Sequence, residues 1–270
     1  MSNPKRVRKR QNKEAVRAAQ LEAARKAKQR QTLIRMGVLG VLAVVLILLT
    51  TFVFGRKSDK SSVASKGSTT TTVAATTSTA NAALAAIKCD DRKPDANAKR
   101  PTFDKPPDMT IDPAKKKYTA IFDTSCGKIT AELDAKGAPK TVNNFVFLAG
   151  KGFYDGLTWH RVVKDFVIQG GDPKGDGTGG PGYKFGDELP KDGYKLGSLA
   201  MANSGPDTNG SQFFIVTGPN GTSLPSSYSR FGMVTDGLAV AQKLESFAQQ
   251  DQKPSRPIYI FRVEITESAA

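Results

Sequence analysis

Hydrophobic and polar positions divide the chain into a part without a globular pattern and a part with one, and the second part begins near Tyr118. From there on, short runs rich in β-branched and aromatic residues alternate with glycine-containing turns, which is typical of strands joined by turns. Residues 118–123 and 128–133 flank a turn over residues 124–127, and this arrangement predicts a hairpin. The pattern therefore predicts a mainly β domain over residues 118–270.

Two stretches of the same region have helical spacing instead. After Pro139, apolar residues recur at intervals of three and four, at Val142, Phe145, Val146 and Ala149. Residues 238–248 have the same character, so both stretches are predicted to be amphipathic helices. Many short strands with two helices favour a closed β-barrel or a sandwich of about 150 residues.

Residues 159–172 are the most unusual of the predicted strand segments, because they contain the only tryptophan and the only histidine of the chain beside Arg161. The β-branched and aromatic content of residues 162–168 predicts one buried strand, with Arg161 and Gln169 near its opposite ends. A lone arginine in such a place is more often part of a structural ion pair than a catalyst, so at this point both roles stay open.

The first 54 residues have the pattern of a membrane anchor. Residues 1–35 carry twelve Lys or Arg against two Glu and predict a solvated cytoplasmic tail, with RNA or anionic-lipid binding as the alternative. Residues 36–54 are uncharged, and as a helix they would span roughly 28 Å, which predicts a transmembrane helix. A signal peptide cleaved near residues 62–64 is the alternative, although the run is longer than a usual signal core. The basic flank places the N-terminus inside and the β domain outside the membrane.

Residues 55–117 connect the two parts. Their first half is almost entirely Ser, Thr, Ala and Val, a composition that cannot bury enough apolar area to fold. Residues 88–117 add five prolines among charged residues, which predicts extended chain rather than a second domain. The whole segment is predicted to be a tether, and glycosylation of its Ser/Thr-rich half stays open.

Charge and cysteine content narrow the chemistry. Residues 118–270 carry fifteen basic and sixteen acidic residues, so the net charge of +15 belongs to the N-terminal part and the domain is not predicted to bind nucleic acid. Cys89 and Cys126 fit no metal motif, and they are either a disulfide or two free thiols, depending on the compartment. The glycine-rich segment 175–182 matches no phosphate-binding motif. We therefore predict no metal and no cofactor.

Three segments resemble the cyclophilin family of peptidyl-prolyl cis/trans isomerases: YDGLTWHRVVKDFVIQGGDP (154–173), GDGTGGPGYKFGDE (175–188) and GSLAMANSGPDTNGSQFFIVT (197–217). The likeness covers about residues 118–266, and the whole arrangement resembles the membrane-anchored bacterial cyclophilins. It implies a closed eight-stranded antiparallel β-barrel capped by two α-helices. It also implies isomerase activity on proline-containing polypeptides.

The resemblance assigns an active surface residue by residue. It implies catalytic roles for Arg161, Phe166 and Gln169. It implies substrate binding by Val167, Ala202, Asn203, Gln212, Phe214, Leu224 and Tyr228.

The sequence departs from the best-known cyclophilins at several positions. Val167 stands where methionine is common, and Lys164-Asp165 stands where Pro-Gly is common. Ser223 and Tyr228 replace the tryptophan and histidine of many eukaryotic members, which implies weak cyclosporin binding. These changes leave open an alternative function, a non-catalytic module of the cell envelope that holds proline-containing segments.

The chemistry of proline isomerisation decides between Arg161 and its neighbour His160. No covalent bond breaks and no proton moves, so general acid–base catalysis by the histidine has no task and a structural role is predicted for it. Rotation localises the lone pair on the prolyl nitrogen, and a fixed, permanently charged guanidinium suits that acceptor. The predicted function is a membrane-anchored isomerase that assists the folding of exported proteins.

Overall fold

The computed structural model describes residues 83–95 and 100–270. The predicted tail (1–35), the predicted transmembrane segment (36–54) and residues 55–82 of the predicted tether lie outside the described residues. Within the described part of the chain, no helix has the length and apolar character needed to cross a membrane.

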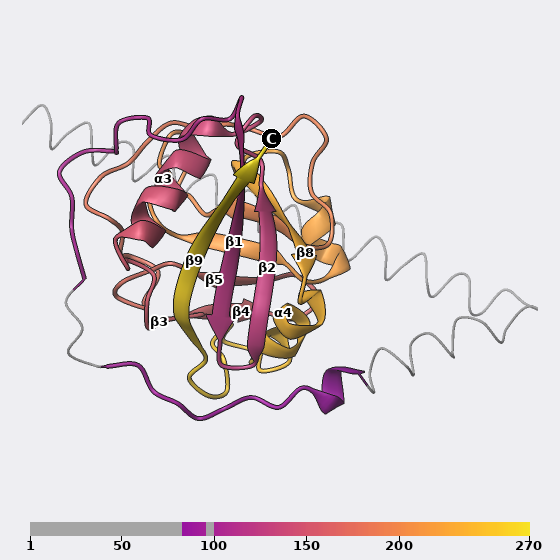
Figure 1. The fold of residues 1–270 in the computed structure, drawn as a ribbon. Coiled ribbons are helices and arrows are strands. Elements are labelled where there is room, and N and C mark those ends of the chain that lie inside the picture. The colour runs from indigo at the N-terminus through magenta and orange to yellow at the C-terminus, as the bar shows by residue number, and fades with distance from the viewer. Residues whose placement is uncertain (1–82, 96–99) are drawn as a thin grey trace, which may run out of the picture. The chain divides into compact units, whose positions relative to one another are not determined.

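The domain is one curled antiparallel sheet (Figure 1). Its strands are β1 (Lys116–Thr124), β2 (Gly127–Leu133), β3 (Leu157–Thr158), β4 (Arg161–Val163), β5 (Val167–Gly170), β6 (Ser198–Met201), β7 (Phe213–Val216), β8 (Arg230–Asp236) and β9 (Tyr259–Ala269). They are hydrogen-bonded in the order β3-β9-β1-β2-β8-β6-β7-β5-β4. The prediction of a mainly β domain with an antiparallel sheet is confirmed.

The predicted number of eight strands was wrong, because the described sheet has nine. The strands at the two ends of the order, β3 and β4, are consecutive in the chain and are separated only by Trp159 and His160. One segment bends at these two residues, so its first half pairs with β9 and its second half with β5. The two ends of the strand order are thus joined by a bent segment of chain. Among the described residues the sheet is curled, and no pairing of β3 with β4 closes it into the predicted barrel.

The prediction of one strand over residues 162–168 was also wrong, because these residues form the hairpin β4–β5. The chain turns at Lys164 and Asp165, and Asp165 has a φ of 56°, a left-handed conformation that aspartate tolerates better than most residues. No glycine or proline marks this turn, so the sequence pattern predicts one continuous strand from the β-branched residues on both sides of it. The hairpin makes Arg161 and Gln169 direct cross-strand partners.

Two α-helices pack on the sheet, near opposite ends of β1 and β2 in Figure 1. Helix α3 (Pro139–Gly150) confirms the first predicted helix and begins with the expected proline. The carboxylate of Glu188 accepts hydrogen bonds from the first backbone N–H groups of α3, at Lys140 and Thr141, where negative charge is favoured. Helix α4 (Leu238–Glu245) ends earlier than predicted, and a 3₁₀ helix, η1 (Pro219–Ser223), follows β7.

Aliphatic and aromatic side chains together fill the inside of the curled sheet, and we call them the inner core. Phe122, Phe145, Trp159 and Phe213 have no exposed surface, and their ring centroids lie 5.6 to 6.4 Å apart in the pairs that touch. Dense aromatic packing of this kind dominates the energetics of a small domain.

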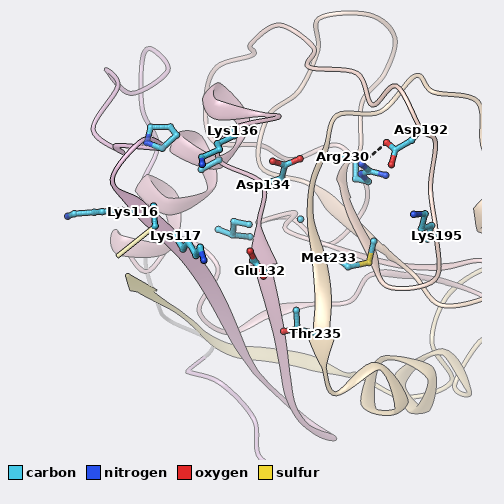
Figure 2. A pocket seen from close by; sticks show the side chains of 15 residues that line it. Lys116, Lys117, Glu132, Asp134, Lys136, Asp192, Lys195, Arg230, Met233 and Thr235 are labelled. Carbon is cyan, nitrogen blue, oxygen red and sulfur yellow. Dashed lines mark hydrogen bonds and ion pairs between the residues drawn. The ribbon is translucent and has the colours of Figure 1, made fainter. Parts of the chain in front are cut away.

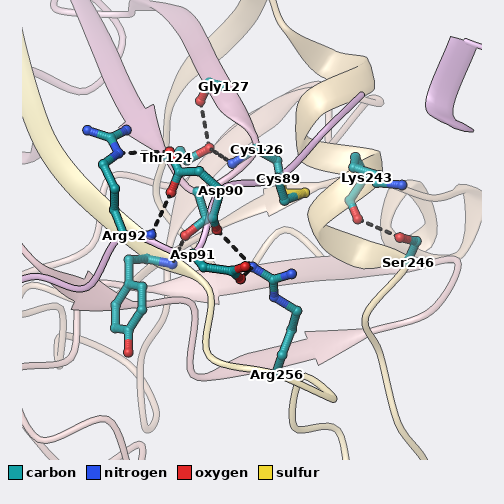
Figure 3. The surroundings of a disulfide bond; sticks show 12 residues. Cys89, Asp90, Asp91, Arg92, Thr124, Cys126, Gly127, Lys243, Ser246 and Arg256 are labelled. Atoms are coloured by element: carbon teal, nitrogen blue, oxygen red, sulfur yellow. Dashed lines mark hydrogen bonds and ion pairs between the residues drawn. A yellow bond between two sulfur atoms is a disulfide. The ribbon is translucent and has the colours of Figure 1, made fainter. Parts of the chain in front are cut away.

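Part of the segment predicted as a tether lies against the domain, and we call residues 87–95 and 100–112 the N-terminal strap. A disulfide joins Cys89 to Cys126 in the β1–β2 turn (Figure 3), which is the first of the two alternatives left open by the sequence. Further along, the Phe103 ring packs edge-on against Phe147 of α3, with centroids 4.9 Å apart. Ile111 is 7% exposed and belongs to the inner core. The packed part of the chain therefore begins before residue 118.

Candidate active site

Strands β5, β6 and β7 have two apolar faces. Side chains alternate between the faces of a strand, so neighbouring residues go to different places. Phe213 and Ile215 belong to the inner core, whereas Phe214 and Val216 belong to a separate cluster on the other face. Ile168 and Val167 divide in the same way. The sheet is thus apolar on its outside at this one place.

We call this second group the outer apolar cluster. Its buried members are Val167, Tyr194, Ala200, Phe214 and Val216, with Phe166, Ala202, Leu224 and Tyr228 packed around them. Six of the predicted site residues are in this cluster: Phe166, Val167, Ala202, Phe214, Leu224 and Tyr228. The fold therefore gathers side chains from five separate stretches of sequence into one partly open apolar surface.

The ring of Phe214 is at the centre of the cluster. The Tyr228 ring stands edge-on to it, with centroids 5.5 Å apart, and the Tyr194 ring lies at 6.4 Å. Phe166 is half-buried and follows the β4–β5 turn, where its carbonyl accepts hydrogen bonds from the N–H groups of Thr217 and Gly218. A flat apolar group the size of a proline ring fits the chemistry of such a surface.

The turn that carries Phe166 depends on close contact with Gly218. A Cβ atom at residue 218 would lie 2.1 Å from the backbone carbon of Asp165, which is closer than atoms can approach. The backbone N–H of Asp165 also donates to the Glu245 carboxylate of α4 at 2.9 Å. The turn is therefore held between the end of β7 and α4.

A row of polar side chains runs beside the outer apolar cluster. The sheet register places Arg161 opposite Gln169, and Gln169 opposite Phe214. Arg161 Nη1 donates to Gln169 Oε1 at 3.3 Å, and Gln169 Nε2 donates to Gln212 Oε1 at 3.0 Å. Gln212 Nε2 in turn donates to the carbonyls of Gly177 and Gly179, at 3.0 and 2.9 Å. Each amide is oriented by its neighbour, so the row has one consistent direction of hydrogen bonding.

Arg161 is half-buried in this row. Loss of solvent lowers the pKa of its guanidinium below the ordinary value of an arginine. That ordinary value is so far above neutrality that the side chain stays cationic. Its Nη2 group has no hydrogen-bond partner among the described residues, so a charged donor is left on the face of the sheet that carries the outer apolar cluster.

Asn203 lies apart from the row. Its Nδ2 donates to the carbonyl of Ser227 at 2.9 Å, and its Oδ1 accepts from the N–H of Gly205 at 3.3 Å. Together with Gln169, Ala202 and Gln212 it lines a cavity of about 860 Å³ beneath the glycine-rich segment. All the predicted site residues thus lie in the outer apolar cluster, in the polar row or on this cavity.

The carboxylate of Asp172, which is 1% exposed, organises the glycine-rich segment. It accepts hydrogen bonds from the backbone N–H groups of Lys174 and Gly177, at 2.8 and 2.5 Å. This buried carboxylate and Gln212 fix the segment from two sides, so the segment forms a wall of the cavity.

Two residues that hold predicted site residues by hydrogen bonds were not themselves predicted from the sequence. Gln252, in the loop after α4, accepts a hydrogen bond from Arg161 Nε at 2.7 Å. The Tyr194 hydroxyl donates to the Tyr228 carbonyl at 2.8 Å and accepts from the Tyr228 N–H at 3.0 Å, which anchors that side of the cluster. In the sequence, Gln252 is marked only by a polar loop without glycine, and Tyr194 only by being an aromatic residue among turn residues. Neither feature is specific.

His160 precedes Arg161 but takes no part in the polar row. Neither ring nitrogen has a hydrogen-bond partner among the described residues, and burial lowers the pKa of the imidazole. His160 thus lies at the bend of the chain between β3 and β4, and its ring nitrogens are buried without a role in the polar row.

A second cavity, of about 440 Å³, lies over β1, β2 and β8 and contains none of the predicted site residues (Figure 2). Arg230 at its edge is bound to Asp192 at 2.7 Å. Within residues 83–95 and 100–270, no group of His, Cys, Asp and Glu side chains is placed to hold a metal ion. The first site itself presents hydrogen-bonding side chains beside an apolar cluster.

Comparison with known proteins agrees with this geometry. Residues 119–265 match the family model described as cyclophilin type peptidyl-prolyl cis-trans isomerase/CLD. The peptidyl-prolyl cis-trans isomerase CYP18-2 of Arabidopsis thaliana is 41% identical over 160 residues, 57% of this chain and 96% of the relative. The isomerase ppi1 of Schizosaccharomyces pombe is 46% identical over 147 residues, 52% of this chain and 94% of the relative.

Solved structures give the same result. A cyclophilin type peptidyl-prolyl cis-trans isomerase of Cryptosporidium parvum superposes with a TM-score of 0.52 at 35% identity, covering 56% of this chain and 98% of that one. Its structure in the presence of the dipeptide Ala-Pro superposes with a TM-score of 0.51, also at 35% identity, covering 55% and 98%. The chain belongs to the cyclophilin family, and its residues 119–265 form a peptidyl-prolyl cis-trans isomerase domain.

Proposed function

We propose that this isomerase is anchored in the membrane, that it accelerates X–Pro isomerisation in exported polypeptides, and that Arg161 is the residue that stabilises the twisted amide. The single observation that carries the catalytic part is the position of Arg161. Its charged Nη2 group has no protein partner among the described residues, and the sheet register puts Arg161 on the same face as Phe214 of the outer apolar cluster.

The reaction requires a donor that acts only at the transition state. The barrier to rotation is about 20 kcal/mol, and the uncatalysed reaction takes tens to hundreds of seconds. When the amide is twisted, the prolyl nitrogen becomes a hydrogen-bond acceptor that it was not in the planar ground state. A turnover of roughly 10³ per second would require about 7 kcal/mol of transition-state stabilisation. Interactions made only at the transition state raise the rate rather than the affinity.

The arrangement of the site divides the work among three groups of residues. The proline ring binds on the outer apolar cluster, with Phe214 beneath it and Phe166 and Leu224 beside it. Gln169, Gln212 and Asn203 hold the backbone of the peptide, so one side of the amide is fixed while the other turns. Arg161 donates a hydrogen bond to the prolyl nitrogen. Partial burial of the guanidinium strengthens this charged hydrogen bond.

Substitution of Arg161 tests this assignment in the full-length chain, purified in a mild detergent. Arg161→Ala and Arg161→Lys should both lose most of their isomerase activity in a protease-coupled assay with a proline peptide. Lysine keeps the charge but not the planar fork of donors, so it should restore little. Full activity of Arg161→Ala would refute the assignment, and peptide binding without isomerisation by the wild type would instead support a non-catalytic binding module.

The anchor and the location rest on different observations. The anchor rests on residues 36–54, which are nineteen uncharged residues preceded by a basic tail. The location rests on the Cys89–Cys126 disulfide, because disulfide bonds persist in oxidising compartments. We expect the N-terminus in the cytoplasm, the isomerase domain outside, and exported chains with slow X–Pro bonds as substrates.

Cell fractionation tests the anchor directly. The full chain should stay in the membrane pellet after extraction with alkaline carbonate, and protease added to intact cells should remove the isomerase domain. A chain with residues 36–54 deleted is the matched control and should appear in the soluble fraction. A domain that is protected from protease until the cells are lysed would contradict the proposed orientation.

A further inference from the structure

The loop after α4 approaches the active site through one residue. Gln252 has a φ of 64°, one of three residues other than glycine with positive φ in the described part of the chain. Glycine adopts this conformation without steric cost, whereas a glutamine does not. A long side chain at such a position calls for a reason, and its contacts supply one.

Gln252 contacts the catalytic strand twice. Its side-chain Oε1 accepts a hydrogen bond from Arg161 Nε at 2.7 Å. Its backbone carbonyl accepts a hydrogen bond from the N–H of Val162, also at 2.7 Å. One residue therefore holds the backbone of β4 beside the arginine and the side chain of the arginine itself.

The two acceptors on Arg161 together fix the plane of its guanidinium. A guanidinium with one acceptor can still rotate about that hydrogen bond. Gln252 binds Nε and Gln169 binds Nη1, so the contacts fall on two different nitrogens. A planar guanidinium that is held at two nitrogens cannot rotate, so its N–H groups point in fixed directions. Nη2, which has no partner among the described residues, is the nitrogen that remains free to donate to the substrate.

The loop that carries Gln252 is itself held in place. The N–H of Gln252 donates to the Gln249 carbonyl at 3.0 Å, and the N–H of Ser255 donates to the Phe247 carbonyl at 2.7 Å. At the far end, Arg256 Nη2 donates to the Asp90 carbonyl at 2.8 Å and pairs with Asp91 at 2.7 Å (Figure 3). The strap next to the disulfide thus holds the base of the loop.

We propose that Gln252 is a positioning residue for catalysis: it orients the Arg161 guanidinium toward the prolyl nitrogen. The inference rests on the proposed role of Arg161. It adds that the loop after α4, which contributes nothing to the apolar surface, sets the direction of the donor.

The test uses the full-length chain and Gln252→Gly, because glycine suits the left-handed backbone and removes only the side chain. We expect kcat to fall about tenfold, the size of one hydrogen bond to a charged group, with KM within twofold of the wild type. The melting temperature should stay the same or rise. Gln252→Asn is the second variant, since asparagine also tolerates this backbone but is one carbon too short to reach Arg161.

Two controls separate positioning from a general effect on the fold. Gln252→Glu keeps an acceptor of the same length and should retain kcat within about threefold, whereas Gln250→Ala, on the exposed part of the same loop, should behave as the wild type. In a double-mutant cycle, Gln252→Gly should cause no further loss when Arg161 is already alanine. A structural role would persist in that background.

The outcomes also separate this inference from the function on which it rests. Wild-type kcat in both Gln252→Gly and Gln252→Asn, with Arg161→Ala inactive, overturns the positioning role and leaves the role of Arg161 intact. A loss that is as large in the Arg161→Ala background as in the wild type overturns it too. Full activity of Arg161→Ala overturns both.

Discussion

The two faces of strands β5, β6 and β7 are built on one backbone but are closed to different degrees. On the inner face, Phe213 has no exposed surface and touches aromatic rings on several sides. On the outer face, its neighbour Phe214 is covered by Tyr194, by Tyr228 and by the half-buried Phe166. The comparison teaches that the inner face is fully closed, while Phe166, Leu224 and Tyr228 on the outer face stay only partly buried, as the proposed binding of a proline ring requires.

Substitution of the adjacent residues Phe213 and Phe214 tests this difference, and the largest expected effect is that of Phe213→Ala on stability. Phe213→Ala should lower the free energy of unfolding by about 3–5 kcal/mol, because it leaves a cavity in a fully packed region. Urea denaturation of the full chain, followed by tryptophan fluorescence, measures the change. A loss below about 1 kcal/mol would mean that the inner core can collapse around the cavity and is not the closed face.

The N-terminal strap, like the inner core, is expected to contribute to stability rather than to catalysis. Cys89→Ser should lower the free energy of unfolding by about 2–4 kcal/mol, because the disulfide restricts the unfolded chain. Cys126→Ser is the matched control and should have the same effect. The kcat/KM value of the folded variants should change much less than their stability, since neither cysteine lies in the outer apolar cluster. Unchanged denaturation midpoints would show that the strap does not contribute.

Phe214→Ala should give the opposite profile. Loss of about 2 kcal/mol of apolar contact with the proline ring corresponds to a fall in kcat/KM of about thirtyfold. Its effect on the free energy of unfolding should be smaller than that of Phe213→Ala. If kcat/KM stays within twofold of the wild type, the outer apolar cluster is not where the proline ring binds.

The smallest expected effect concerns His160. Burial lowers the pKa of His160 in the folded state, so the unfolded chain binds the proton more strongly. This group's contribution to stability is therefore complete above the ordinary histidine pKa of about 6.5 and is lost as the pH falls toward the folded value. The difference in denaturation midpoint between wild type and His160→Gln should shrink from pH 8 to pH 5. A difference that is the same at every pH would contradict this.

Much of the fold followed from local patterns, and the failures have physical causes. The β1–β2 hairpin and helix α3 were predicted because glycine, proline and apolar spacing all point the same way. The β4–β5 turn was missed because aspartate, rather than glycine, adopts the left-handed conformation at residue 165. The bend at residues 159–160 was missed because it only appears when β3 and β4 choose different partners.

The candidate site could be predicted from the sequence only as far as the resemblance reached. It assigned Arg161, Phe166 and Gln169, which the hairpin brings together although the predicted single strand would have kept Arg161 and Gln169 apart. Gln252 is 91 residues from Arg161, and Tyr194 acts through backbone groups of a distant residue. Contacts of this kind depend on how the sheet curls, and periodicity carries no information about them.

One measurement tests the central claim, that Arg161 stabilises the twisted amide rather than the bound peptide. The full chain and its Arg161→Ala variant would be compared for kcat by a protease-coupled assay and for Kd of the same proline peptide by titration calorimetry. We predict that kcat falls about a hundredfold, as for other donors that act on developing charge, while Kd changes less than threefold. Equal losses in kcat/KM and in binding affinity, with kcat unchanged, would contradict the account.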